Sequence, residues 1–166
     1  LKTLCLTAEA FRLNTGSVPY LCVAGKHGNA CGLGSSKGSP VEAVEKALFG
    51  NPRSVWGGEL IANFTIDKEI AELLHQCQKR EALLASSYWM LDLILAPYIS
   101  SEAIEILNKR NKRKIFVNEA LISSSLKKTG YDYRPVRGGF LRQPPLTESD
   151  AVIASEVVPV EVNGTI

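Results

Sequence analysis

The chain lacks a long apolar run, is poor in histidine and has no marked excess of charge of either sign. No stretch approaches the roughly 20 apolar residues that a membrane-spanning helix needs, so we expect no membrane partner. A formal net charge of +2 is nearly balanced and argues against a nucleic-acid partner. With two histidines and no CxxC pair, the chain is not expected to bind zinc.

The cysteines and the first residues bear on the compartment. Cys5, Cys22, Cys31 and Cys77 are widely spaced, and reduced thiols of a cytoplasmic protein explain them most simply. No charged segment followed by an apolar one opens the chain, so nothing indicates secretion. The start at Leu1 rather than at methionine favours a processed chain or a fragment.

Helical and extended patterns alternate along the 166 residues, which suffice for one domain with a sizeable core. Strands are predicted at residues 18–24, 59–64, 90–96 and 115–117, and one more over 133–143 that is interrupted at a glycine pair. Helices are predicted at residues 2–13, 40–49 and 67–75, and from residue 100 onward. This alternation predicts an α/β domain whose helices cover a largely parallel sheet.

Two local features refine the predicted helices. Ser39, Pro40 and Glu42 form a capping box with proline at the first helical position, so a helix should begin at Pro40. The helix that opens near Ser100 ends in the basic run 109–114. We interpret this run as a solvated helix C-terminus that complements the helix dipole, rather than as a nucleic-acid patch.

Lys26 and His27 directly follow the apolar run 18–24 and precede a glycine-containing loop. A buried strand would deliver both side chains to a strand end, where glycines let a ligand approach the backbone. Histidine titrates near neutral pH, and the neighbouring lysine supplies a proton or a fixed positive charge. The pair is a candidate for proton transfer, although a solvated loop dipeptide fits the same spacing. Cys31 as a nucleophile beside His27 is a weaker interpretation than a small buried thiol.

Two glycine pairs and one acid are further candidates. Gly57-Gly58 and Gly138-Gly139 either mark tight turns and bulges or leave the backbone bare for a flat ligand, on which Trp56 would stack. Asp92 lies inside an apolar strand and is expected to be buried, where a carboxylate needs a partner. A structural hydrogen bond at the strand end and a contact with a ligand both satisfy that need.

Several segments resemble one enzyme family in the same order. Lys26-His27-x-Asn29-x-Cys31-Gly32 resembles the Lys-His-x-Asn-Pro-Cys-Gly motif of AICAR transformylase, the formyl-transfer part of the bifunctional enzyme that also carries IMP cyclohydrolase. Residues 51–58 are similar to that family's Asp-Pro-Val-Ser-Ala-Phe-Gly-Gly segment. Residues 92–97 and 101–107 are similar to its Val-Ile-Ile-Ala-Pro strand and Ser-Glu-Glu-Ala-Leu-Glu-Ile-Leu helix, and residues 137–141 to a Gly-Gly-Leu-Leu segment.

The resemblance implies a three-layer α/β/α fold, cytidine-deaminase-like, with a mixed and largely parallel sheet. It also implies formyl transfer from 10-formyltetrahydrofolate to the 5-amino group of AICAR in purine (IMP) biosynthesis, without a metal, by a homodimer. Zinc deamination is not expected, because the sequence has neither an H-x-E nor a P-C-x-x-C motif.

The resemblance assigns roles by position in these motifs. His27 would take the amine proton, and Lys26 would stabilise the tetrahedral oxyanion or protonate the departing folate nitrogen. The remaining motif positions would bind the two substrates: AICAR by Asn29, Gly57 and Asp92, and the folate by Arg53 and Trp56.

The chain also departs from the family pattern. Ala30 stands where proline is usual, and the Lys-Ser-Asn-Ala motif of the family's second subdomain is absent. We therefore interpret residues 1–150 as the first transformylase-like subdomain and residues 151–166 as a tail or the start of a second one. Three explanations stay open: an excised fragment, a split enzyme whose companion chain supplies the second subdomain, or a degenerate relative that binds without turnover. The alternative to an enzyme is a non-catalytic nucleotide-binding or assembly subunit related to this family.

Overall fold

The computed structural model describes residues 1–109, 113–123 and 131–144. Its helices in these ranges are α1 (Lys2–Thr15), α2 (Pro40–Phe49), α3 (Lys68–His75), α4 (Gln78–Leu84) and α5 (Ser101–Asn108), with a 3₁₀ helix η1 (Glu119–Ile122). Its strands are β1 (Tyr20–Lys26), β2 (Asn29–Ser36), β3 (Gly58–Ala62), β4 (Leu91–Ala96), β5 (Lys114–Val117), β6 (Asp132–Val136) and β7 (Gly139–Gln143). None of these helices is long and apolar enough to cross a membrane.

Five of the strands form one mixed sheet in the order β2-β1-β3-β4-β5. β1 is antiparallel to both β2 and β3, whereas β3, β4 and β5 are parallel. Within this sheet four strands therefore point the same way, which confirms the largely parallel arrangement. Gly25 pairs with Glu59 and Gly58 pairs with Leu91, so the C-terminal end of β1 lies beside the N-terminal ends of β3 and β4. We call this the Lys26 end of the sheet.

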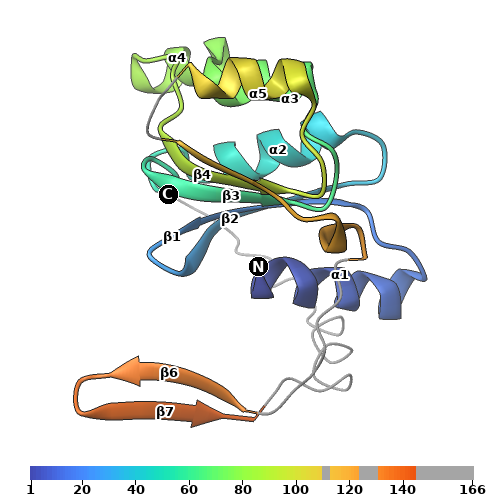
Figure 1. Cartoon of the computed structure of the whole chain (residues 1–166), viewed down its shortest axis with the longest axis vertical. Coiled ribbons are helices and arrows are strands. Elements are labelled where there is room, and N and C mark those ends of the chain that lie inside the picture. Colours follow the sequence, from blue (N-terminus) through green and yellow to red (C-terminus); the bar gives the residue numbers. More distant parts are fainter. Residues whose placement is uncertain (110–112, 124–130, 145–166) are drawn as a thin grey trace, which may run out of the picture.

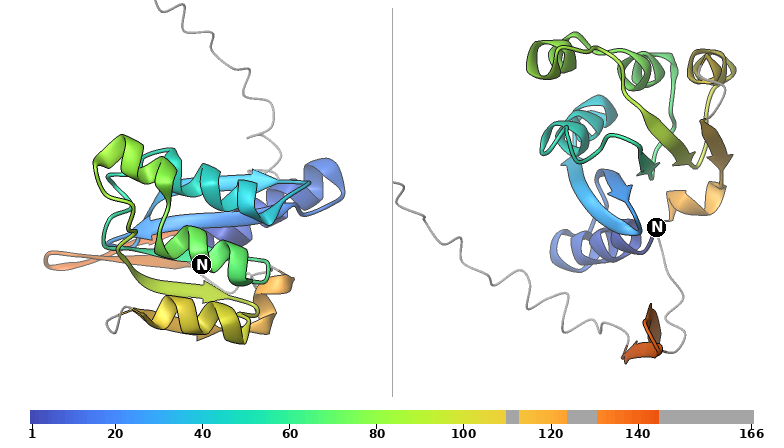
Figure 2. Two further views of the ribbon diagram at one scale, coloured as in Figure 1. Left: turned by 90° about the horizontal axis from the view of Figure 1, so that it is seen from above. Right: turned by 90° about the vertical axis from the view of Figure 1, so that its left-hand side faces the viewer.

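Helices cover both faces of the sheet and give the domain three layers (Figure 1, Figure 2). α2, α3 and α5 lie over one face, where strand residues such as Ala24 and Leu60 are fully buried. α1 and η1 lie over the opposite face, which receives Leu21 and Val23 of β1. Successive residues of a strand point to opposite faces, and both faces here are apolar. The α/β/α class predicted from the sequence is confirmed.

Helix α2 begins where the capping signal places it. The Ser39 hydroxyl oxygen accepts a hydrogen bond from the backbone N–H of Glu42 at 3.4 Å, and Pro40 is the first helical residue. The Glu42 carboxylate does not close the box on Ser39; it accepts a hydrogen bond from the Ser36 hydroxyl at 2.5 Å. Only the Ser39 half of the capping box is therefore formed. The Glu42 side chain instead ties the helix to the end of β2.

The structure contains a strand, β2, that the sequence pattern does not predict. Its residues Gly32 and Gly34 lie directly under α2. A Cβ on Gly32 would stand 2.0 Å from the carbonyl oxygen of Ala47, and one on Gly34 would stand 1.9 Å from that of Ala43. No side chain fits at such distances, so glycine at these two positions allows α2 to pack against the strand.

The interpretation of the basic run 109–114 as solvated is wrong for Arg113, which is buried. Its guanidinium donates hydrogen bonds to the carbonyl oxygens of Leu91 at 3.0 Å, Trp89 at 3.2 Å and Leu107 at 3.4 Å. These carbonyls satisfy its donors and so allow the charge to be buried. Because Leu107 lies in the last turn of α5, Arg113 does serve the helix C-terminus. Residues 110–112 of the run lie outside the described residues.

β6 and β7 form a second, two-stranded sheet, and their turn contains Gly138 at a φ of 88°. The predicted strand over residues 133–143, interrupted at the glycine pair, is confirmed as this hairpin. Three of its large apolar side chains, Tyr133, Phe140 and Leu141, are at least 60 % exposed. The predicted domain boundary after residue 150 lies outside the described residues.

Candidate functional site

The turn between β1 and β2 carries the candidate proton-transfer pair. Lys26 and Asn29 are register partners, and the two residues between them, His27 and Gly28, have φ angles of 53° and 77°. A tight two-residue hairpin turn of type I′ needs positive φ at both central positions; glycine adopts it freely, and histidine more readily than most residues. The Asn29 side-chain amide donates a hydrogen bond to the His27 carbonyl oxygen at 3.3 Å. His27 is therefore held, exposed, at the tip of the turn beside Lys26.

The loop between α2 and β3 lies against this hairpin. The Nζ of Lys26 donates a hydrogen bond to the carbonyl oxygen of Trp56 at 2.7 Å. Gly57 has a φ of 71° and donates its N–H to the carbonyl oxygen of Met90, the residue before β4, at 2.7 Å. A Cβ on Gly58 would stand 2.4 Å from a backbone oxygen of β1. The tight-turn interpretation of this glycine pair is confirmed, and contact of Gly57 with a ligand stays a prediction.

Asp92 lies at the start of β4, where the register between β3 and β4 shifts. Gly58 pairs with Leu91 and Glu59 with Leu93, so Asp92 is the extra residue of a bulge. Its side chain is exposed and makes no hydrogen bond or ion pair with the residues that the structure describes. The prediction that Asp92 is buried is therefore wrong, because the bulge takes it out of the strand's regular alternation. Asp92 remains at the Lys26 end of the sheet, and its contact with a substrate stays a prediction.

Trp56 forms the outer side of a stack that leads into the core. The guanidinium carbon of Arg80, from α4, lies over the Trp56 ring at 4.7 Å from its centroid and over the Trp89 ring at 4.9 Å. Arg80 and Trp89 are buried, whereas Trp56 is 39 % exposed. One face of the Trp56 ring is thus covered by a cation, an arrangement that favours both groups. The rest of the ring is partly exposed, and its stacking on a flat ligand stays a prediction.

The predicted site residues lie together at the Lys26 end of the sheet, and Arg53 is the least constrained of them. Lys26 contacts Trp56 and lies next to the turn tip. Gly57 directly precedes β3, and Asp92 lies at the start of β4. Arg53 is exposed on the same loop as Trp56. Its backbone carbonyl accepts a hydrogen bond from the Trp56 N–H at 3.4 Å, and its side chain has no hydrogen bond or ion pair within the described ranges.

Cys31 lies close to this site in β2. Burial raises the pKa of the Cys31 thiol; the positive charge of Lys26 opposes this shift, and the negative charge of Glu59 adds to it. A thiol with a raised pKa is protonated at neutral pH and is a weak nucleophile. The interpretation of Cys31 as a small, partly buried thiol is therefore the better supported of the two.

The family model described as the AICARFT/IMPCHase bienzyme matches residues 5–161. The chain belongs to the AICARFT/IMPCHase family. The resemblance in the Lys26-His27 motif and in the three segments after it is thereby confirmed at the level of the family.

Curated relatives of this AICARFT/IMPCHase-family chain match over most of its length. The bifunctional purine biosynthesis protein PurH of Bacillus cytotoxicus is 37 % identical over 146 residues, which cover 84 % of this chain and 25 % of that protein. PurH of Bacillus cereus is 38 % identical, with the same coverage. The chain thus spans about a quarter of the length of these relatives. Among solved structures, the apo dCMP deaminase of cyanophage S-TIM5 matches at a TM-score of 0.41 and 12 % identity, over 70 % of this chain and 94 % of that one. A likeness of that extent carries nothing about the site.

Two charged side chains near the predicted site residues fall outside the sequence prediction. Glu59 is the second residue of β3, and its Oε2 would stand 3.3 Å from a Cβ on Gly25. An acid at the start of an apolar strand is a signal that could have identified it. Arg80 carries no such local signal, because the two rings that enclose it come from distant segments of the chain.

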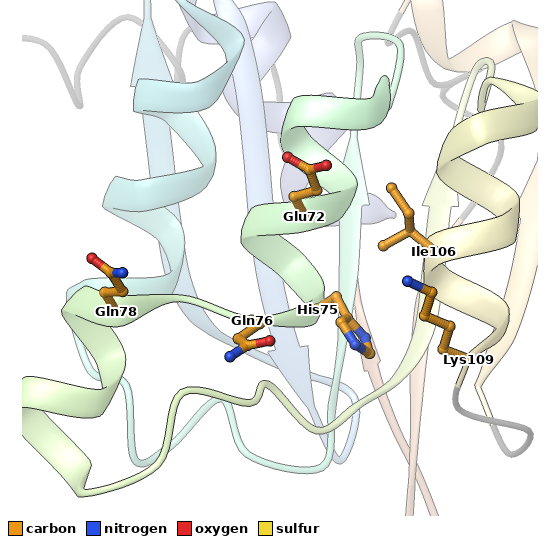
Figure 3. A pocket seen from close by; sticks show the side chains of 6 residues that line it. All are labelled: Glu72, His75, Gln76, Gln78, Ile106 and Lys109. Atoms are coloured by element: carbon orange, nitrogen blue, oxygen red, sulfur yellow. The ribbon is translucent and has the colours of Figure 1, made fainter.

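A pocket of about 370 Å³ lies away from the Lys26 end of the sheet, near the ends of α3 and α5 (Figure 3). The residues that line it include none of the predicted site residues; they are Glu72, His75, Gln76, Gln78, Ile106 and Lys109. Among the residues that the structure describes, no group of three or more His, Cys, Asp or Glu side chains is placed to hold a metal ion.

Proposed function

We propose that this chain acts in purine biosynthesis, as all or part of an enzyme that transfers a formyl group from 10-formyltetrahydrofolate to the 5-amino group of AICAR. The observation that carries the proposal is the placement of Lys26 and His27. The Lys26 amine is held 2.7 Å from the Trp56 carbonyl oxygen, and His27 stands exposed at the adjoining turn tip. Membership of the AICARFT/IMPCHase family and the match of the Lys26-His27 motif support it.

The reaction needs help with a proton and with a developing charge. The AICAR amine is conjugated to the imidazole ring and its carboxamide, so it is a poor nucleophile. Its attack on the formyl carbon forms a C–N bond and places negative charge on the formyl oxygen; the bond to the folate nitrogen then breaks. His27 accepts the amine proton, and a positioned base of this kind contributes about 100- to 10,000-fold. Lys26 stabilises the oxyanion or gives a proton to the departing nitrogen.

The proposed substrate contacts follow from the exposure of the remaining residues. At the Lys26 end of the sheet, AICAR would be bound by Asn29, Gly57 and Asp92. Trp56 offers the folate a ring whose inner face already rests on Arg80. Arg53, exposed on the same loop, supplies a cation for the folate carboxylates.

A second candidate function is suggested by the openness of the site. His27, Asn29, Arg53 and Asp92 are all exposed, whereas charge stabilisation is strongest where water is excluded. We propose that a second copy of the chain or a companion chain covers this surface during catalysis. If it does not, the chain is a non-catalytic nucleotide-binding or assembly subunit.

Formyl transfer by the chain itself tests the proposal, followed by the absorbance change as tetrahydrofolate forms. Lys26→Met is expected to abolish transfer, whereas Lys37→Met is the matched control. Lys37 is exposed and follows Ser36 at the opposite end of the β1–β2 hairpin, so its loss should leave transfer unchanged. Absence of transfer by the unmodified chain, with AICAR binding still measurable by calorimetry, would indicate either a half-site that needs a companion chain or the binding-subunit alternative.

A further inference from the structure

Arg80 contacts the side chain of Trp56, the residue whose carbonyl oxygen accepts the hydrogen bond of Lys26. We infer that Arg80 is a positioning residue for Lys26: its guanidinium fixes the Trp56 ring and, through it, the carbonyl that orients the lysine amine. As a statement about catalysis this rests on the proposed formyl transfer. The positioning of Lys26 itself rests only on the contacts of Arg80 with Trp56 and Trp89.

The stack joins three segments that are separate in the sequence. Trp56 comes from the loop after α2, Arg80 from α4, and Trp89 from the segment before β4. The guanidinium carbon of Arg80 lies over both rings, at 4.7 Å from the Trp56 centroid and 4.9 Å from the Trp89 centroid. One terminal nitrogen of Arg80 also donates a hydrogen bond to the Ser86 carbonyl oxygen, which ties α4 to the third segment.

The inner part of the stack is anchored in the core. Trp89 is fully buried and meets Phe49, at the end of α2, edge to face at 5.5 Å between ring centroids. The Nζ of Lys79 lies 4.5 Å from the centroid of the Phe49 ring. Trp56 is thus the exposed end of a row whose other end is built into the helix layer.

The row matters for Lys26 because a lysine side chain is flexible. Its four-carbon stem loses considerable rotamer entropy when the amine is held in one place, so the acceptor must itself be fixed. The Trp56 carbonyl is held on one side by the chain, since Gly57 donates its N–H at 2.7 Å to the residue before β4. Arg80 holds the side chain of the same residue. The guanidinium contacts both rings at once, and a planar guanidinium can stack on aromatic rings in a way that a lysine ammonium cannot.

The experiment measures the reactivity of Lys26 directly. The purified chain is trace-labelled with acetic anhydride, and labelling of individual lysines is measured by peptide mass spectrometry. Arg80→Met is expected to raise the labelling rate of Lys26 by about tenfold, because a lysine that loses a charge-assisted hydrogen bond is more often accessible. Arg80→Lys, which keeps the charge but not the stack, should lie between this variant and the unmodified chain.

Two controls separate positioning from general loosening. Lys46, whose Nζ donates to the Ser35 carbonyl oxygen at 3.1 Å, is the internal reference and should label at the same rate in every variant. Lys79→Met changes a cation of the same helix that lies over Phe49, away from Trp56, and should leave Lys26 labelling unchanged. If Arg80→Met loosens the whole domain, the labelling rate of Lys46 will also rise. The labelling of Lys26 relative to Lys46 in Arg80→Lys then tests the inference.

Kinetics separate this inference from the proposed function. Where the chain transfers formyl groups, Arg80→Met should lower kcat while the KM for AICAR changes little, because Arg80 does not touch AICAR. A chain without transfer activity would contradict the proposed function and leave the labelling result intact. Unchanged Lys26 labelling in both Arg80 variants overturns the inference. So does a rise in Lys26 labelling that Lys46 matches in Arg80→Lys as well as in Arg80→Met.

Discussion

The Nζ of Lys26 and the carbonyl oxygen of Trp56 are joined by a 2.7 Å hydrogen bond, although 30 positions separate the two residues in the chain. This bond connects the β1–β2 turn to the loop that carries the paired glycines. The candidate proton-transfer pair and the ring proposed to face the folate therefore form one structural unit. Changes to the turn, to the loop or to the local charges should have consequences that can be measured separately.

The first prediction concerns the left-handed backbone of His27. Asparagine tolerates this conformation well, so His27→Asn should leave the free energy of unfolding nearly unchanged. A β-branched residue does not tolerate it, and His27→Val should lower the free energy of unfolding by about 1 to 2 kcal/mol. Urea denaturation checks both. Equal stability of the two variants would show that the turn does not have this geometry.

The second prediction concerns the contact between α2 and β2. Gly34→Ala would place a Cβ 1.9 Å from the Ala43 carbonyl oxygen, so the helix must move. We expect it to lower the free energy of unfolding by about 3 kcal/mol, the upper part of the range for overpacking. Gly38→Ala is the matched control, because a Cβ there meets nothing within 4 Å and the φ of Gly38 is not positive. A loss of equal size in both variants, measured by urea denaturation, would count against the close packing.

The third prediction uses Cys31 as a reporter of charge at the site. Lys26 lowers the pKa of the Cys31 thiol and Glu59 raises it, on top of the larger raising effect of burial. Lys26→Met should therefore leave less thiolate and slow alkylation by iodoacetamide at pH 8 by roughly twofold, and Glu59→Gln should speed it by a similar factor. Mass spectrometry of the Cys31 peptide follows the rate. Changes in the same direction for both variants would refute the charge arrangement.

The fourth prediction concerns stability and pH at the start of α2. Hydrogen bonds from Lys46 and then Ser36 hold the pKa of the Glu42 carboxyl below the usual glutamate value of 4.5. A lowered folded-state pKa stabilises the protein above the usual value, and this stabilisation is lost as the pH falls through the lowered one. Glu42→Gln should therefore lower the Tm at pH 7 and make less difference at pH 3. A difference of the same size at both pH values would disprove the assignment.

Local sequence signals predicted the elements whose causes are local. The start of α2 follows from Ser39 and Pro40, and the start of α3 from Asp67, whose side chain accepts a hydrogen bond from the Ile70 N–H at 3.0 Å. β2 escaped prediction because its glycines are required by a helix that follows it in the chain, and glycine carries no strand propensity. α4 escaped because its residues are mostly polar, and its one buried residue is Arg80.

The site shows the same division between local and tertiary causes. The Lys26-His27 pair was visible because the apolar run before it predicts a strand end. The exposure of Asp92 could not be predicted, since the bulge that displaces it depends on the register with β3. The Arg80 stack depends on three segments that meet only in the folded chain. Residue type and spacing thus located the chemistry, and tertiary contacts determine how it is held.

The most direct test of the account is the role of His27 as the acceptor of the amine proton. The measurement is formyl transfer by the unmodified chain and by His27→Asn, with AICAR binding determined by calorimetry on the same preparations. The account predicts that transfer falls about 100-fold or more while the Kd for AICAR stays within about twofold, because the histidine acts in the transition state. Undiminished transfer by His27→Asn, or a loss explained entirely by weaker AICAR binding, would contradict it.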